Sequence, residues 1–97
     1  MPNNVDAYVC RVCGYNCHPF MPWGEDMEVP SFDICDCCGV EWGYEDLTLD
    51  GIHRYRQQWA AKGFPWAAKR FSWFNENLIP PDWDAEKQMQ AIPERFR

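Results

Sequence analysis

The sequence lacks the features that would carry it into or across a membrane. Its start, residues 1–6, has no basic region followed by an apolar run, and no apolar stretch approaches the roughly 18 residues that a membrane-spanning helix needs. We therefore expect a cytoplasmic protein without a membrane partner. Because a reducing cytoplasm keeps thiols unpaired, the six cysteines are expected to bind metal rather than to form disulfides.

Basic residues are nearly absent from the first half of the chain. Residues 1–50 hold one basic residue, Arg11, and ten acidic residues, a net charge of −9. Residues 51–97 hold eight basic and five acidic residues, a net charge of +3. A negative field repels phosphate backbones and attracts basic surfaces. We therefore expect a protein partner with a basic surface, and binding to nucleic acid is the weakest of the hypotheses below.

The cysteines that are present form a regular pattern. The two Cys-x-x-Cys-Gly turns are the first knuckle (residues 10–14) and the second knuckle (residues 35–39), with 21 residues between Cys13 and Cys35. Two thiolates three positions apart on a tight turn can point at one ion, and the glycine that follows them tolerates a positive φ. Two such turns face to face supply the four sulfurs of a structural Zn²⁺ site. The predicted ligands of Zn²⁺ are Cys10, Cys13, Cys35 and Cys38.

Three nearby residues are alternative ligands, namely Cys17, His18 and Cys37. Cys17 and His18 lie just outside the first knuckle, where we expect a free buried thiol and a loop histidine. Cys37 competes with its neighbours in the second knuckle, but the glycine that follows Cys38 favours Cys38. Pairing of the two knuckles into disulfides is a further alternative, against which the missing secretory signal argues.

Local patterns predict a small α+β fold in which residues 1–97 form a single domain. A metal-binding ribbon over residues 1–49 is followed by a helical annex over residues 50–97, which is expected to pack on the ribbon. The loop at residues 16–30, with three prolines, is expected to fold back onto it. The ribbon is expected to contain short strands or extended strips at 8–9, 31–34 and 40–46.

The annex is expected to contain two to three short helices. Thr48 or Asp50 can cap a helix that runs to about Lys62, where Gly63 ends it. Its inner stripe is formed by Ile52, Tyr55 and Trp59, with the stem of Arg56. Residues 66 to 71 or 74 can form a second helix anchored by aromatic side chains, Trp66, Phe71, Trp73 and Phe74. Asp82 or Asp84 can cap a last helix to about Ile92, before a tail at residues 94–97.

Two families resemble parts of this sequence. The knuckles, with Tyr8-Val9 before the first and Val40 after the second, resemble those of rubredoxin. Residues 31–39, Ser-Phe-Asp-Ile-Cys-Asp-Cys-Cys-Gly, resemble a sequence segment of the bacterial cysteine-rich CPCC type of small zinc-ribbon protein. Residues 42–46, 55–59 and 83–88 are similar to the later segments of longer members of that type. Proline is missing from both knuckles, where Arg11 and Asp36 replace it. Some proteins of this type resemble the products of genes that lie beside toxin genes, so the resemblance implies an immunity protein.

We therefore expect a non-enzymatic zinc-binding protein that acts by protein–protein binding, as an immunity protein that neutralises a bacterial toxin. The alternative is a rubredoxin-like electron carrier with iron in the same four-cysteine site. A nucleic-acid-binding zinc ribbon is the lesser alternative. No catalytic residue is expected, because His53 has no evident nucleophile or second base and a run of carboxylates is more often a solvated face than a glycosidase-like pair. The residues expected to contact a basic partner are Glu25, Asp26, Glu28, Glu41, Glu45 and Asp46.

Overall fold

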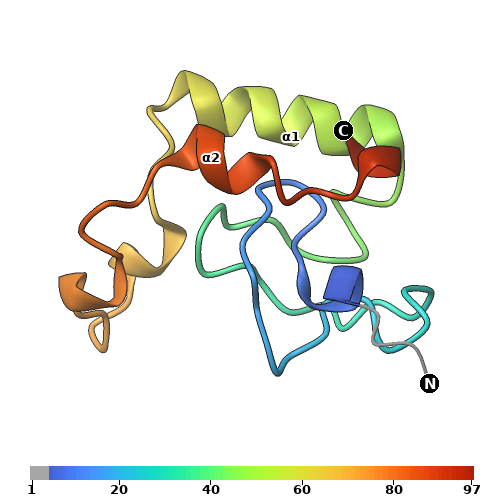
Figure 1. The fold of residues 1–97 in the computed structure, drawn as a ribbon, viewed down its shortest axis with the longest axis horizontal. Coiled ribbons are helices and arrows are strands. Elements are labelled where there is room, and N and C mark those ends of the chain that lie inside the picture. Colours follow the sequence, from blue (N-terminus) through green and yellow to red (C-terminus); the bar gives the residue numbers. More distant parts are fainter. Residues whose placement is uncertain (1–4) are drawn as a thin grey trace.

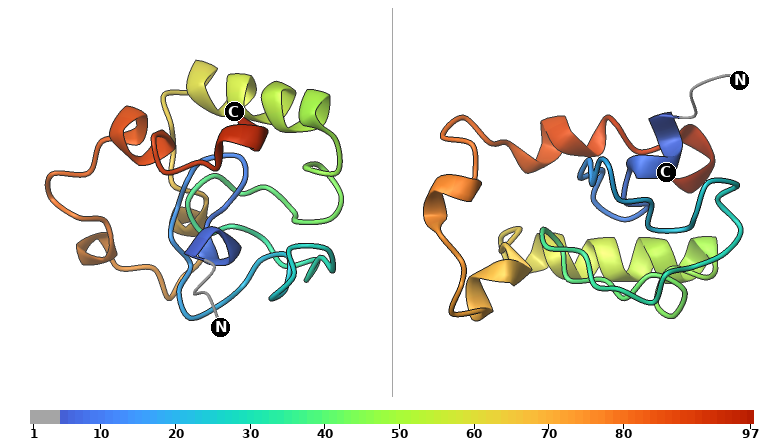
Figure 2. Two further views of the ribbon diagram at one scale, coloured as in Figure 1. Left: turned by 45° about the vertical axis from the view of Figure 1, so that its right-hand side comes forward. Right: turned by 90° about the horizontal axis from the view of Figure 1, so that it is seen from below.

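A computed structural model describes residues 5–97. Helices α1 (Leu49–Ala61) and α2 (Ala85–Met89) lie on one side of the molecule, over the irregular loops of the first half (Figure 1). The segment between these helices swings out to one end, as Figure 2 also shows. Within the described residues, no helix combines the length and apolar character needed to cross a bilayer. The loops give way to α1 at Leu49.

Helix α1 follows the sequence prediction closely. The side chain of Thr48 accepts a hydrogen bond from the Gly51 N–H at 3.0 Å, which caps the first turn. Gly63, with a φ of +86°, lies just past the helix and lets the chain turn away. Ile52 and Trp59 are buried on the inner face. This side chain pattern fixes which face of α1 lies against the knuckles.

The remaining helical segments are shorter than predicted. Asp84 caps α2 by accepting hydrogen bonds from two backbone N–H groups, but α2 ends at Met89 rather than near Ile92. The expected helix after Trp66 is a single 3₁₀ turn, η2 (Ala67–Arg70). Further 3₁₀ turns include η1 (Val5–Tyr8) and η3 (Glu76–Leu78). Each short turn is positioned by packing and loop contacts, because it is too short to be stable alone.

The end of the chain is docked rather than free. A 3₁₀ turn, η4 (Glu94–Phe96), replaces the expected tail. The carbonyl oxygen of Arg97 lies 2.7 Å from Nε2 of His53 and 3.3 Å from Nη1 of Arg56. Both partners belong to α1, so the last residues pack against the helix and extend the annex.

The expected strands are reduced to single residue pairs. Across residues 5–97 antiparallel pairing consists of two isolated bridges, Val9 with Asn16 and Ile34 with Glu41, and no strand forms. Each bridge closes the base of one knuckle, and pairing extends no further because η1 ends directly before Val9 and turns begin directly after Glu41. The structure therefore does not show the α+β class. The extended strip expected at 40–46 was also wrong, because residues 42–46 form turns.

An aromatic cluster joins the annex to the knuckles. Trp66 packs edge-on against Trp83 and Tyr15, with ring centroids 5.3 and 5.4 Å apart, and Trp83 also meets Trp59. Such edge-to-face pairs add to the stabilisation from apolar burial. Trp73, predicted as an anchor, is instead exposed and stacks on a neighbouring ring in the outlying segment. The core thus lies between α1, α2 and the knuckles.

Candidate metal centre

The four predicted ligands bring their sulfurs together in the interior. The ligand atoms of Cys10, Cys13, Cys35 and Cys38 all lie within 4.8 Å of one another. The sulfurs of Cys10 and Cys38 are 3.8 Å apart, and those of Cys13 and Cys35 are 3.7 Å apart. A tetrahedral ion with Zn–S bonds of about 2.3 Å separates its sulfurs by about 3.8 Å, whereas a disulfide spans about 2.05 Å. The donor set fits a divalent metal, and all four thiols are free.

The sulfur cluster is dry, which makes it costly to ionise without a cation. Cys10, Cys13 and Cys35 are 0% exposed and Cys38 is 5% exposed. Burial raises the pKa of Cys13, and contacts with the neighbouring sulfurs raise it further. Burial likewise raises the pKa of Cys35 and Cys38. Burial also acts to raise the pKa of Cys10, but hydrogen bonds with the other three sulfurs outweigh it and lower this pKa, so one of the four is the first to ionise. A divalent cation at the centre reverses this effect, because it stabilises thiolates outright.

Both knuckles present their sulfurs through the same backbone hydrogen bonds. In the first knuckle the Cys10 N–H donates to the Tyr15 carbonyl at 2.9 Å, and the Gly14 N–H donates to the Cys10 carbonyl at 3.0 Å. In the second knuckle the N–H groups of Cys35 and Gly39 make the equivalent bonds, both at 2.9 Å. The two glycines have φ values of +82° and +84°, which only glycine adopts easily. The sequence pattern therefore encodes two matching turns.

Helix α1 holds each knuckle through a different side chain. The Tyr55 hydroxyl donates to the Cys38 carbonyl oxygen at 3.0 Å. The Arg56 guanidinium donates to the carbonyl oxygens of Val12 at 2.7 Å and Arg11 at 2.9 Å. Burial raises the pKa of Tyr55 and lowers that of Arg56. These bonds fix the first knuckle relative to the second.

Helix α2 closes over the first knuckle from another direction. Nε2 of Gln88 donates to the Cys13 carbonyl at 3.0 Å and to the Cys37 sulfur at 3.4 Å. A Cβ added to Gly14 would overlap the Gln88 carbonyl oxygen, so the backbone of α2 lies directly against this glycine. Nothing in the sequence around Gln88 signals these contacts, which connect residues far apart in the chain.

The alternative ligands lie outside the group of four sulfurs. Cys37 is fully buried but its sulfur accepts from Gln88 and does not belong to that group. Cys17 is half-buried, and its thiol donates to the Tyr15 carbonyl at 3.6 Å. Burial raises the pKa of Cys17, which keeps its thiol protonated at neutral pH. His18 is exposed, with its ring packed on Tyr8.

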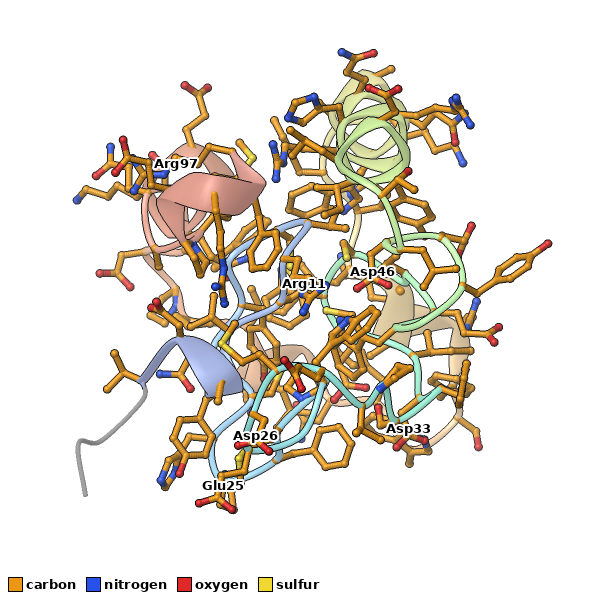
Figure 3. The ribbon with its side chains drawn as sticks, turned by 90° about the vertical axis from the view of Figure 1, so that its right-hand side faces the viewer. Arg11, Glu25, Asp26, Asp33, Asp46 and Arg97 are labelled. Atoms are coloured by element: carbon orange, nitrogen blue, oxygen red, sulfur yellow. The ribbon has the colours of Figure 1, made fainter. Side chains whose placement is uncertain are left out.

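A buried charged group links the loop at 16–30 to the first knuckle. The guanidinium of Arg11 lies between two rings, 3.8 Å from the centroid of Trp23 and 4.3 Å from that of Phe96, and donates to the Met27 carbonyl. The Trp23 indole N–H in turn donates to Asp46 at 2.8 Å. Figure 3 shows Arg11 and Asp46 close together in the interior. Arg11 thus replaces the expected proline with a buried cation that anchors the loop.

The acidic residues predicted to contact a partner divide by burial into an exposed, a half-buried and a fully buried group. Glu25, Asp26 and Glu28 are exposed on the loop at 16–30. Glu41 and Glu45 are half-buried, and the Glu45 carboxylate accepts from the Glu41 N–H at 3.1 Å.

Asp46 was a wrong choice as a contact residue. It is 0% exposed, because its carboxylate accepts from the Gly43 N–H at 2.7 Å as well as from the Trp23 indole. Burial raises the pKa of Asp46, while these two hydrogen bonds act in the opposite direction. The residue therefore supports the loop and takes no part in the surface.

Comparisons with known proteins give distant relatives of unknown function. No family model matches the chain, and no solved structure matches it. The chain is 35% identical over 71 residues to the uncharacterized protein YozI of Bacillus subtilis (strain 168), covering 58% of this chain and 59% of YozI. It is 33% identical over 71 residues to the uncharacterized protein YoaQ of the same strain, covering 59% of this chain and 60% of YoaQ. The chain thus spans about three fifths of the length of these relatives.

Proposed function

We propose that the protein is a non-enzymatic zinc-binding protein in which one Zn²⁺ ion joins the two knuckles. The observation that supports this is the group of four buried sulfurs with separations of 3.7 and 3.8 Å along two of its edges. Four cysteines without an open position are typical of a structural site rather than a catalytic one. The ion would clamp two turns that share no strand in the described residues, and its binding free energy would become folding free energy.

The clamped knuckles present an acidic surface, which we propose binds a basic protein. The exposed carboxylates of Glu25, Asp26 and Glu28 support this, together with the net charge of −9 over residues 1–50. Acidic surfaces steer basic partners and speed their association. The resemblance to the CPCC type narrows the proposal to an immunity protein that neutralises a basic bacterial toxin.

Two measurements test this function separately. Elemental analysis of a native preparation should find one zinc per chain; a red, redox-active protein with iron would instead support the rubredoxin-like electron carrier. Co-expression with the products of neighbouring genes should reveal one that is toxic alone and is bound by this protein. The immunity proposal fails if no neighbouring product is toxic or bound.

A further inference from the structure

A cavity of about 360 Å³ is lined by residues that follow the first knuckle and by residues in and around the second knuckle. Tyr15 and Phe20 follow the first knuckle, and Asp33, Ile34 and Asp36 come from the approach to the second knuckle and from within it. Trp42 also lines the cavity. Its volume falls at the lower end of the roughly 300–1,000 Å³ of small-ligand sites. The cavity owes its shape to the relative placement of the knuckles.

The lining combines aromatic surface with negative charge. Two carboxylates, Asp33 and Asp36, are exposed at the cavity, and its nine described lining residues include His18 but no Lys or Arg. Phe20 is 41% exposed, and its ring packs on the indole of Trp42 with centroids 5.9 Å apart. Aromatic faces attract cations, and carboxylates pair with them. The lining therefore suits a positively charged group.

The aromatic part of the cavity is held firmly in place. The Trp42 indole N–H donates to the Cys10 sulfur at 3.4 Å, and Trp42 is only 3% exposed. Its backbone N–H donates to the Asp33 carbonyl at 3.0 Å. The Asp36 carbonyl accepts from the Ala68 N–H, which fixes the second knuckle against η2. A preformed site of this kind loses little entropy when it binds.

We propose that this cavity binds an arginine side chain of the protein partner. Arginine fits better than lysine, because its planar guanidinium stacks on aromatic rings and pairs with carboxylates at the same time. The inference rests on the proposed binding of a basic protein and adds the place where the partner is anchored. Figure 3 shows Asp33 on a different loop from Glu25 and Asp26, on the side of the molecule opposite α1. The carboxylates of the loop at 16–30 then steer the partner, while the cavity holds one residue of it.

A titration of metal-loaded, ¹⁵N-labelled protein with the peptide acetyl-Gly-Arg-Gly-amide tests the inference. Backbone signals of residues 15–20 and 33–36 should shift. The lysine peptide should bind more weakly, and the neutral citrulline peptide should bind least. Shifts confined to other regions, no shifts at millimolar peptide, or equal binding of the citrulline peptide would overturn the proposal.

Two double variants with the same change in charge distinguish binding in the cavity from attraction by the overall negative charge of the protein. Asp33→Asn with Asp36→Asn should weaken arginine-peptide binding about 5- to 20-fold, since each ion pair contributes up to about fivefold. Glu86→Gln with Glu94→Gln, two exposed residues outside both the cavity and the loop at 16–30, should change it less than about twofold, because screening limits distant charges. Equal losses in both variants would overturn the inference. Dispersed spectra of both variants establish that they are folded.

The same variants distinguish failure of this inference from failure of the proposed function. If a protein partner binds the Asp33→Asn, Asp36→Asn variant as tightly as the parent, the cavity is not the anchor, although the function stands. If the peptide occupies the cavity but no basic protein partner exists, the proposed function fails while the site remains.

Discussion

Tyr55 and Arg56 are consecutive residues of α1, yet each binds a different knuckle. Tyr55 donates to the Cys38 carbonyl and Arg56 to the Val12 carbonyl, at 3.0 and 2.7 Å. Successive side chains on a helix point about 100° apart, so one turn of α1 can reach to both sides of the sulfur cluster. The helix therefore constrains the spacing of the knuckles in addition to the ion.

Replacing Arg56 should destabilise the protein more than its partial exposure suggests. Arg56→Lys loses the fork that reaches the carbonyls of Val12, Arg11 and Phe96, and we expect a loss of about 2–4 kcal/mol. Arg54→Lys, on the exposed face of the same helix, should change the free energy of unfolding by less than about 0.5 kcal/mol. Urea unfolding with saturating Zn²⁺ measures both; equal values would contradict the role of Arg56.

The four ligands should differ sharply from the nearby cysteine. Cys10→Ser and Cys38→Ser should abolish the cooperative thermal transition, because metal binding supplies the folding free energy. Cys17→Ser should cost about 1 kcal/mol or less. A chelator should lower the melting temperature of the parent and of Cys17→Ser, but should have little effect on the two ligand variants. Similar melting curves for all three variants would show that the ligand set is wrong.

Two glycines with similar backbone angles provide a matched test of the contact with α2. Gly14 and Gly63 have φ values of +82° and +86°, but an added Cβ meets the Gln88 carbonyl only at Gly14 and meets nothing within 4 Å at Gly63. Both alanine variants bear the cost of the left-handed conformation, about 1–2 kcal/mol. Gly14→Ala should cost about 1–3 kcal/mol more, from overpacking. The difference between the denaturant midpoints of the two alanine variants measures this overpacking cost. Equal midpoints would contradict the close approach of α2 to Gly14.

The buried carboxylate of Asp46 should contribute more than the exposed acids. Asp46→Asn keeps the size and shape of the side chain but replaces one carboxylate oxygen with an NH₂ group. Either the Trp23 indole N–H or the Gly43 N–H then loses its acceptor. Arg11 nearby also loses a compensating charge. We expect a loss of about 2–3 kcal/mol, compared with less than about 0.5 kcal/mol for Asp26→Asn. Unfolding monitored by Trp fluorescence compares the two, and a neutral effect at Asp46 would refute the proposed support of the loop.

Cys17 should be a slow nucleophile. Burial raises its pKa, so at pH 7.5 the reactive thiolate is scarcer than in an ordinary thiol. Alkylation of the zinc-loaded protein by iodoacetamide should be at least about tenfold slower than that of a small-molecule thiol, a factor that corresponds to one pKa unit. The rate should rise as the pH is raised. Rapid, pH-independent labelling of Cys17, located by mass spectrometry, would contradict this expectation.

Sequence reasoning identified the features that depend on short-range patterns. The four sulfurs lie together as the spacing predicted, and α1 begins after Thr48 and ends near Lys62 because cap and glycine are local signals. The strands were overestimated, because alternation over 40–46 also suits a series of turns held by Asp46. Hydrophobic pattern could not show that Asp46 is buried, since its partner Trp23 is 23 residues away. The docking of residues 94–97 likewise depends on His53 and Arg56, which are distant in sequence.

The local bonding of each knuckle bears on how the ion is taken up. Both backbone bonds of a knuckle close within six residues, so either turn can form and catch a metal with two sulfurs while the other is still distant. Bringing in the second pair then closes a loop of moderate length, whose entropic cost grows only slowly with the number of residues. Assembly can therefore proceed in two stages and can start at either knuckle.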